Sequence, residues 1–171
     1  YELWNNQSAY HNLPTINGVQ QQAGREFSAR NVNYEETDQH ARLSLDLAAA
    51  YPPEANISSW KRTITLQRGK GVEISEDILL TETRLALQLN FLTPLNVDIT
   101  TPGVIQMHSD SDDRRYSLTY EAEKFKATVE QIAITDSRMS RNWGNKVRRL
   151  ILTATTMKAE DLVKISIRER E

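Results

Sequence analysis

The sequence predicts an all-β protein, folded as one antiparallel β-sandwich over residues 1–171 with little or no helix. Apolar residues alternate with polar ones in many short stretches, turn-forming residues separate these stretches at roughly ten-residue intervals, and helical periodicity is nearly absent. Because successive side chains of a strand point to opposite faces, this alternation predicts strands that bury one face against a second sheet.

The alternation predicts about nine or ten strands. One of them would place Leu85, Leu87, Leu89 and Phe91 on a single face. The others are expected around residues 13–16, 43–47, 60–66, 72–74, 97–99, 116–120, 132–134, 150–152 and 163–167.

Turn signals punctuate these strands, at Asn17-Gly18, Pro52-Pro53, residues 68–71, Thr93-Pro94, residues 101–103 and Gly144-Asn145. Residues 156–163 fit one helical turn or a hairpin loop equally well, so this alternative stays open.

The composition is that of an ordinary globular protein, with 39% apolar and 26% charged residues. The formal net charge of −2 argues against nucleic acid as the main partner, whereas a local basic patch would suffice for an acidic polysaccharide. The sequence has no cysteine, which excludes disulfides and thiolate zinc sites. Apolar runs such as residues 78–80 are far too short to cross a bilayer, so no membrane span is expected.

The segment 4–20 is unusually rich in amide, aromatic and imidazole side chains. In its middle, His11 and Asn12 precede a short apolar strand that ends at Asn17-Gly18. His11 fits two interpretations: a half-buried, hydrogen-bonded histidine of a hairpin, or a metal ligand or substrate contact. Imidazole is a common zinc ligand, but one ligand does not make a site.

The run Trp-x-x-Gln-Ser-x-Tyr-His-Asn-Leu-Pro-x-Ile-Asn-Gly-x-x-Gln at residues 4–21 resembles the His-Asn segment of heparinase II/III-like proteins. Further matches follow in the expected order, namely Tyr51 within residues 48–52, Trp60-Lys61-Arg62, residues 72–77 and Asn142-Trp143-Gly144. The resemblance therefore spans most of the chain.

This resemblance implies that the chain is the C-terminal, supersandwich-like domain of a longer bacterial polysaccharide lyase, accessory to an upstream (α/α) toroid. Such lyases cut uronic-acid polysaccharides by β-elimination, which needs a base for the C5 proton, an acid for the leaving oxygen and neutralisation of the carboxylate. The family's catalytic Tyr, His and Asn lie before the point where this sequence begins. No catalytic residue is therefore assigned, and we expect the chain alone to be inactive.

The resemblance also implies a metal site and a location. Some relatives hold zinc in the sandwich through the His of the His-Asn segment, together with a His and an Asp from upstream. His11 matches the first of these ligands, so the expected partners are zinc in the intact protein, the toroid and an acidic polysaccharide. A periplasmic or secreted location follows as well. The polysaccharide that is cleaved and the oligomeric state stay open.

Other candidate residues have simpler interpretations. His40 and His108 are expected as polar residues at strand ends, and residues 109–113 as a solvated hairpin tip instead of a calcium loop. Trp60 is expected in the core, whereas Trp4 and Trp143 are candidates for stacking on sugar rings. A basic group fits either contacts with an acidic glycan or a solvated strand edge: Arg138, Arg141, Lys146, Arg148 and Arg149.

Two rival functions are compatible with the same fold. A stand-alone, non-catalytic carbohydrate-binding module predicts a row of exposed aromatic side chains on one sheet. A purely structural adaptor predicts neither glycan binding nor a surface that faces another domain.

Overall fold

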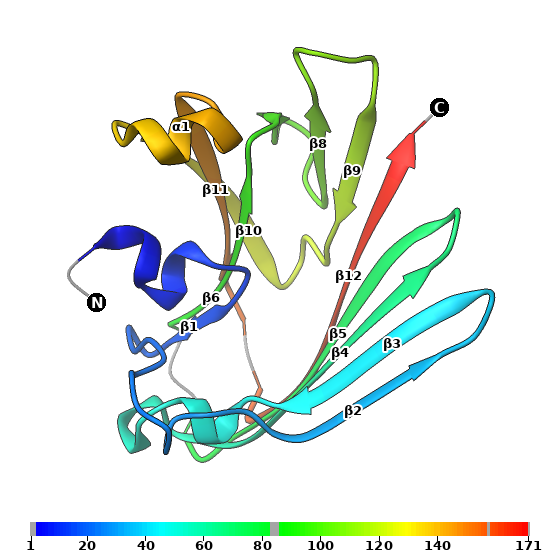
Figure 1. The fold of residues 1–171 in the computed structure, drawn as a ribbon. Helices are drawn as coiled ribbons and strands as arrows, with labels where there is room; N and C mark the ends of the chain where they lie inside the picture. The colour runs from blue at the N-terminus through cyan, green and yellow to red at the C-terminus, as the bar shows by residue number, and fades with distance from the viewer. Residues whose placement is uncertain (1–2, 83–85, 157, 171) are drawn as a thin grey trace.

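The computed structural model describes residues 3–82, 86–156 and 158–170, and these residues form two antiparallel sheets. The first sheet has four strands in the order β1-β6-β11-β10, and the second has eight in the order β2-β3-β4-β5-β12-β9-β8-β7. Figure 1 shows the small sheet lying against one part of the strongly curved large sheet. The predicted all-β antiparallel sandwich is therefore confirmed.

Twelve strands, four 3-10 helices and one α-helix follow one another along the described residues. Their bounds are η1 (Trp4–Asn6), η2 (Ser8–Tyr10), β1 (Pro14–Ile16), β2 (Arg30–Glu36), β3 (His40–Asp46), η3 (Ala48–Ala50), η4 (Pro53–Ala55), β4 (Ile57–Gln67), β5 (Gly71–Leu80), β6 (Leu87–Thr93), β7 (Asn96–Asp98), β8 (Val104–His108), β9 (Arg115–Thr119), β10 (Phe125–Ala133), α1 (Ser137–Trp143), β11 (Lys146–Ala154) and β12 (Glu160–Arg170).

The core lies between the two sheets and is made by the alternating apolar side chains. Leu89 of β6 and Leu152 of β11 are cross-strand neighbours in the small sheet, and both are fully buried. The facing side of the large sheet contributes the buried side chains of Ile78 on β5 and of Val163 and Ile165 on β12. Alternation therefore decides which face of each strand is inside.

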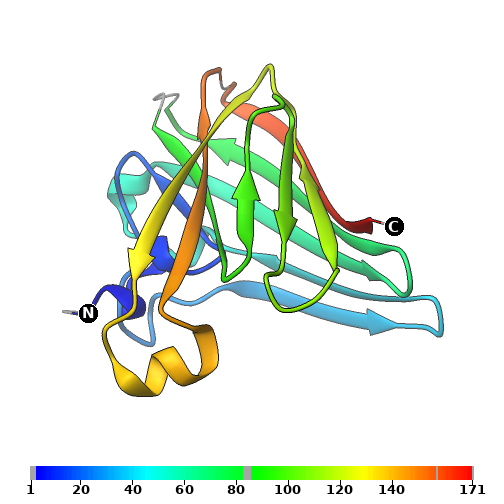
Figure 2. The same cartoon turned by 90° about the horizontal axis from the view of Figure 1, so that it is seen from above.

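The large sheet extends beyond the small one. Figures 1 and 2 show that the far halves of β2 to β5 project away from β6, β10 and β11. The N-terminal segment and α1 lie at the same end of the molecule in both views. These two segments border the candidate site described below.

Several local predictions are confirmed. Asn17 and Gly18 have positive φ angles of 53° and 74° and form the turn after β1. The hairpin loop considered for residues 156–163 is not found among the described residues: β12 begins at Glu160, and β11 and β12 belong to different sheets, so the connection between them crosses from one sheet to the other. The described residues of this stretch contain no helical turn either, and Met157 lies outside them. Leu85, expected at the start of a strand, also lies outside the described residues, while Leu87, Leu89 and Phe91 are buried on β6.

Helix α1 was not predicted. Arg138 and Arg141 lie on this helix, and Lys146, Arg148 and Arg149 lie on β11, which runs between β6 and β10. The interpretation of this basic group as a strand edge is therefore wrong. Asp136 is the N-cap of this helix, and its side chain accepts hydrogen bonds from the backbone N–H groups of Arg138 and Met139.

Candidate functional site

The segment that carries the family resemblance folds into two single-turn 3-10 helices, η1 and η2, followed by a turn at His11 and Asn12 and by strand β1. Gln20 and Ser8 fasten the second 3-10 helix. The Gln20 Oε1 atom accepts a hydrogen bond from the backbone N–H of Ala9 at 2.9 Å, and the Ser8 Oγ atom accepts one from the backbone N–H of Gln21 at 3.0 Å. Gln20 and Ser8 therefore form hydrogen bonds with the backbone of the motif itself.

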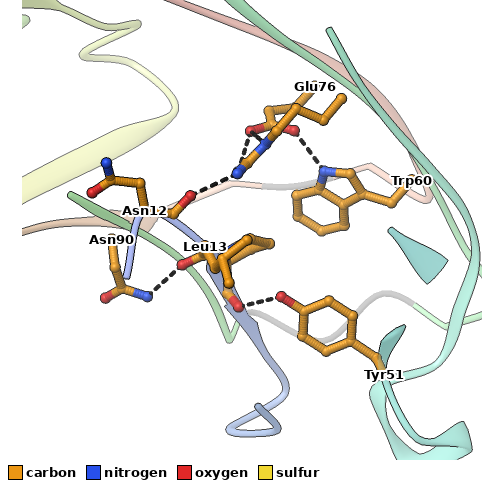
Figure 3. Close-up of polar contacts among 8 residues, drawn as sticks. Asn12, Leu13, Tyr51, Trp60, Glu76 and Asn90 are labelled. Carbon is orange, nitrogen blue, oxygen red and sulfur yellow. Dashed lines mark hydrogen bonds and ion pairs between the residues drawn. The ribbon is translucent and has the colours of Figure 1, made fainter. Parts of the chain in front are cut away.

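The Asn12 end of this segment is held by a buried ion pair (Figure 3). Arg62 Nη2 lies 2.6 Å from Glu76 Oε1, and Arg62 Nη1 donates a hydrogen bond of 2.6 Å to the backbone carbonyl of Asn12. The second Glu76 oxygen accepts a hydrogen bond of 2.7 Å from Trp60 Nε1. Buried charges need such partners, because isolated charges are costly in a low-dielectric interior.

Two further side chains secure the backbone between Asn12 and β1. Asn90 Nδ2 donates to the Leu13 carbonyl at 2.9 Å, and the Tyr51 hydroxyl donates to the Pro14 carbonyl at 2.6 Å. Burial raises the pKa of Tyr51 well above its ordinary value, so the hydroxyl remains a donor. The matched residues Tyr51, Trp60 and Arg62 are therefore brought together around one segment.

The Asn12 side chain completes this attachment. Its Oδ1 atom accepts a hydrogen bond of 2.9 Å from the backbone N–H of Leu92 on β6. With its side chain and its backbone carbonyl both engaged, Asn12 has a fixed position. His11, the preceding residue, is exposed. The first interpretation of His11, a half-buried residue of a hairpin, is therefore wrong with respect to burial.

His11 borders a pocket of about 380 Å³ between the N-terminal segment and α1. Aromatic and apolar side chains line most of this pocket, together with polar groups from the His11-Asn12 turn. The lining residues are Trp4, Asn5, Tyr10, His11, Asn12, Leu92, Thr93, Met139, Trp143 and Val147. Trp143 is 52% exposed, so its ring remains accessible to a ligand.

One wall of this pocket is supported by two aromatic rings in edge-to-face contact and by a cation. The rings of Trp4 and Tyr10 meet edge to face with centroids 5.3 Å apart. The Arg149 guanidinium lies 4.4 Å from the centroid of the Tyr10 ring and forms an ion pair of 2.7 Å with Glu130. The arrangement combines ring faces suited to sugar C–H groups with polar groups suited to hydroxyls.

The remaining sequence candidates lie elsewhere. Trp60 is fully buried, as predicted. His40 lies at the tip of the β2–β3 hairpin, where Thr37 Oγ1 is 3.1 Å from its Nδ1 atom. His108 is exposed at the end of β8, and residues 109–113 join β8 to β9. Across the described ranges, no three His, Cys, Asp or Glu residues come together in a way that would hold a metal ion.

No helix among the described residues is long and apolar enough to span a bilayer.

No protein-family model matches the sequence, and no curated protein matches it. The fold, however, matches solved structures closely. The heparan sulfate lyase HepC from Pedobacter heparinus superposes with a TM-score of 0.75 at 11% identity, over 98% of this chain and 25% of that one. A heparinase III gene product superposes with a TM-score of 0.70 at 12% identity, over 98% and 25% of the two chains.

A further heparinase III structure has a TM-score of 0.66 at 10% identity, over 97% of this chain and 24% of that one. The chain thus spans about a quarter of the length of the heparinase chains that it matches. Along nearly its whole described length the chain has a heparinase III-like fold, as the resemblance in residues 4–21 predicted.

Proposed function

We propose that this chain is the accessory β-sandwich of a polysaccharide lyase that cleaves uronic-acid polysaccharides by β-elimination. In this proposal the proton-transfer groups lie in an upstream (α/α) toroid, and the sandwich forms one wall of the substrate cleft. The protein would act in the periplasm or outside the cell, where such polysaccharides are found. The chain alone would then have no lyase activity.

The observation that carries the proposal is the contrast between His11 and the residues that hold it. His11 is exposed at the pocket, while Asn12 is fixed by Arg62 and by the backbone of Leu92. Fixing the backbone beside an exposed imidazole in this way makes sense when the imidazole meets a ligand or a second domain at a defined position.

Exposed apolar side chains on the large sheet support contact with a second domain. Tyr34 of β2 is 60% exposed and Leu66 of β4 is 41% exposed. The strand register places both on the same face as the buried Trp60, where the sheet extends beyond the small one. Neighbouring apolar side chains that face solvent are typical of surfaces that another protein or domain covers.

A zinc site is part of this proposal, with only one of its ligands on this chain. We infer that His11 supplies one ligand and that the other ligands come from upstream of this chain, because the described residues offer no complete set. Zinc binding measured by competition with a chromogenic chelator should be weak for residues 1–171 and tight for the longer protein. In the longer protein His11→Ala should weaken it, whereas His40→Ala should not. Equal zinc affinity of His11→Ala and the unchanged protein would contradict the assignment.

The lyase proposal is tested by the ultraviolet absorbance of unsaturated uronate products. Residues 1–171 and a longer protein with the upstream region would be incubated with heparan sulfate, heparin, alginate and chondroitin. We expect product only from the longer protein and with one class of polysaccharide. Product formed by residues 1–171 alone would show that the chain has its own active site, and no product from either protein would refute the lyase.

A stand-alone carbohydrate-binding module is the second candidate, favoured by the exposed Trp143 at the pocket. A row of exposed aromatics on one sheet is not found among the described residues, since Trp143 lies on α1 and the exposed Tyr34 on β2. Glycan binding by residues 1–171 that Trp143→Ala abolishes, without lyase activity in the longer protein, would favour the module.

A further inference from the structure

A row of basic side chains crosses three neighbouring strands on the outer face of the large sheet. His108 of β8 pairs with Arg115 of β9, and Arg115 pairs with Arg170 of β12. Directly paired residues of antiparallel strands project their side chains to the same face. The buried Ile105 and Leu118 on these strands occupy the alternate positions, so the basic row faces outward.

The two arginines of this row are not neutralised by ion pairs within the described part of the chain. Among the described residues, no carboxylate forms an ion pair with Arg115 or Arg170, and like charges directly opposite each other on paired strands destabilise the sheet. Asp112 is nearby, but its carboxylate is engaged by Arg114 at 2.7 Å. Glu169 pairs with Tyr116 and therefore projects to the opposite face. An external anion would relieve the repulsion between Arg115 and Arg170.

The outer face has two separate depressions. A depression of about 410 Å³ contains His108, Arg115 and Arg170 among its lining residues, beside the exposed Asp113. A second depression, of about 500 Å³, lies further along β12 and is lined in part by Lys164, by Arg168 and by Glu73, which lies 3.6 Å from Arg168.

Hydroxyl groups lie between these cations. Ser117 pairs with Arg168, and Thr119 pairs with Ser166, whose hydroxyl lies 2.6 Å from the Thr119 hydroxyl. The face along β9 and β12 therefore places guanidinium groups, which suit carboxylate and sulfate oxygens, beside hydroxyls that suit sugar hydroxyls.

We propose that this outer face along β9 and β12 binds an acidic polysaccharide chain, through Arg115 and Arg170 at its carboxylate or sulfate groups. The inference rests on the proposed function for the class of ligand, but it concerns a different surface. The pocket at His11 lies between the N-terminal segment and α1 on the small sheet, whereas this face belongs to the large sheet. It would hold a stretch of polymer outside the cleft and keep a long substrate attached between cleavage events.

The test measures binding of residues 1–171 to heparan sulfate polymer by isothermal titration calorimetry at low and at moderate salt. We expect the double variant Arg115→Gln/Arg170→Gln to bind at least about tenfold more weakly than the unchanged chain. Arg115→Lys/Arg170→Lys, which keeps the charge and loses the guanidinium fork, should bind with intermediate affinity. Affinity should fall as salt increases, because the contacts are exposed.

The matched control is Arg25→Gln/Arg30→Gln, which removes the same charge from two exposed arginines elsewhere. Its affinity should stay within about twofold of that of the unchanged chain. An equal loss in both double variants would show unspecific attraction by net charge, and no loss in either would overturn the inference. Binding of a single-stranded oligonucleotide as tight as that of heparan sulfate would also overturn it. Thermal melting of each variant shows whether the fold is intact.

Failure of this inference is distinguishable from failure of the lyase proposal. If the longer protein forms unsaturated products while the Arg115/Arg170 variant binds polymer normally, only the outer surface is refuted. If the variant loses polymer binding while the longer protein forms no product, the surface stands without the lyase.

Discussion

The Arg62 guanidinium bridges the Glu76 carboxylate and the backbone carbonyl of Asn12, with 2.6 Å to an oxygen on either side. Arg62 and Glu76 face each other on neighbouring strands of the large sheet, and both are buried. The ion pair therefore connects the large sheet to the turn that carries His11.

Glu76→Gln should lower the free energy of unfolding by about 3–5 kcal/mol, because it leaves the buried Arg62 without a counter-charge. Glu73→Gln is the matched control on the same strand, since Glu73 is exposed and only loosely paired with Arg168 at 3.6 Å. Urea unfolding of both variants checks the difference, with a change of less than about 0.5 kcal/mol expected for Glu73→Gln. Similar losses in the two variants would contradict a buried, paired Glu76.

Tyr51→Phe should lower the free energy of unfolding by about 1–3 kcal/mol, because the buried Pro14 carbonyl loses its hydrogen-bond donor. It should also change the pH dependence. Burial raises the pKa of Tyr51, so the unfolded chain ionises first as pH increases. The contribution of the neutral Tyr51 hydroxyl to the free energy of unfolding is therefore complete below about pH 10. This contribution is lost as pH rises toward the folded-state pKa.

The Tyr51→Phe variant should lack this alkaline component. Urea unfolding of both proteins between pH 8 and about pH 11 measures it, and parallel stability curves would show that Tyr51 ionises as easily in the folded chain as in the unfolded one.

The variants Trp60→Ala and Trp143→Ala compare the same substitution at a buried and at an exposed position. Trp60 is fully buried and Trp143 is 52% exposed. We expect Trp60→Ala to cost about 3–5 kcal/mol and Trp143→Ala less than about 0.5 kcal/mol. Differential scanning calorimetry measures both, and a large loss for Trp143→Ala would mean that this side chain supports the fold instead of serving a ligand.

Gly71→Ala and Gly69→Ala compare two glycines of the β4–β5 turn. A Cβ atom at Gly71 would lie 2.3 Å from the Ile167 carbonyl oxygen, whereas no atom lies within 4 Å of a Cβ at Gly69. Because both glycines have positive φ, Gly69→Ala should lower the free energy of unfolding by about 1 kcal/mol. Gly71→Ala should lower it by at least about 3 kcal/mol, because the clash with the Ile167 carbonyl oxygen adds to the backbone strain. Chemical unfolding of the two variants gives the comparison, and equal costs would argue against the close approach of β12 to Gly71.

Part of the site was predictable from local signals. The His-Asn segment stood out by its composition, and Asn17-Gly18 marked the turn that follows β1. The helix α1 also had signals that could have been used. Asp136 is a suitable N-cap and Gly144 ends the helix with φ at 75°, but seven residues are too short for an apolar period to be recognised.

The sequence by itself determined that the chain is all-β, that Trp60 is internal and that residues 4–21 form an unusual segment, because the pleat of a strand and the chemistry of a turn act over a few residues. Only the tertiary structure decided that Arg62 holds Asn12, 50 positions away in sequence, and that Arg115 faces Arg170. These pairings depend on strand register, which is set by the packing of the whole sandwich and not by any single stretch of sequence.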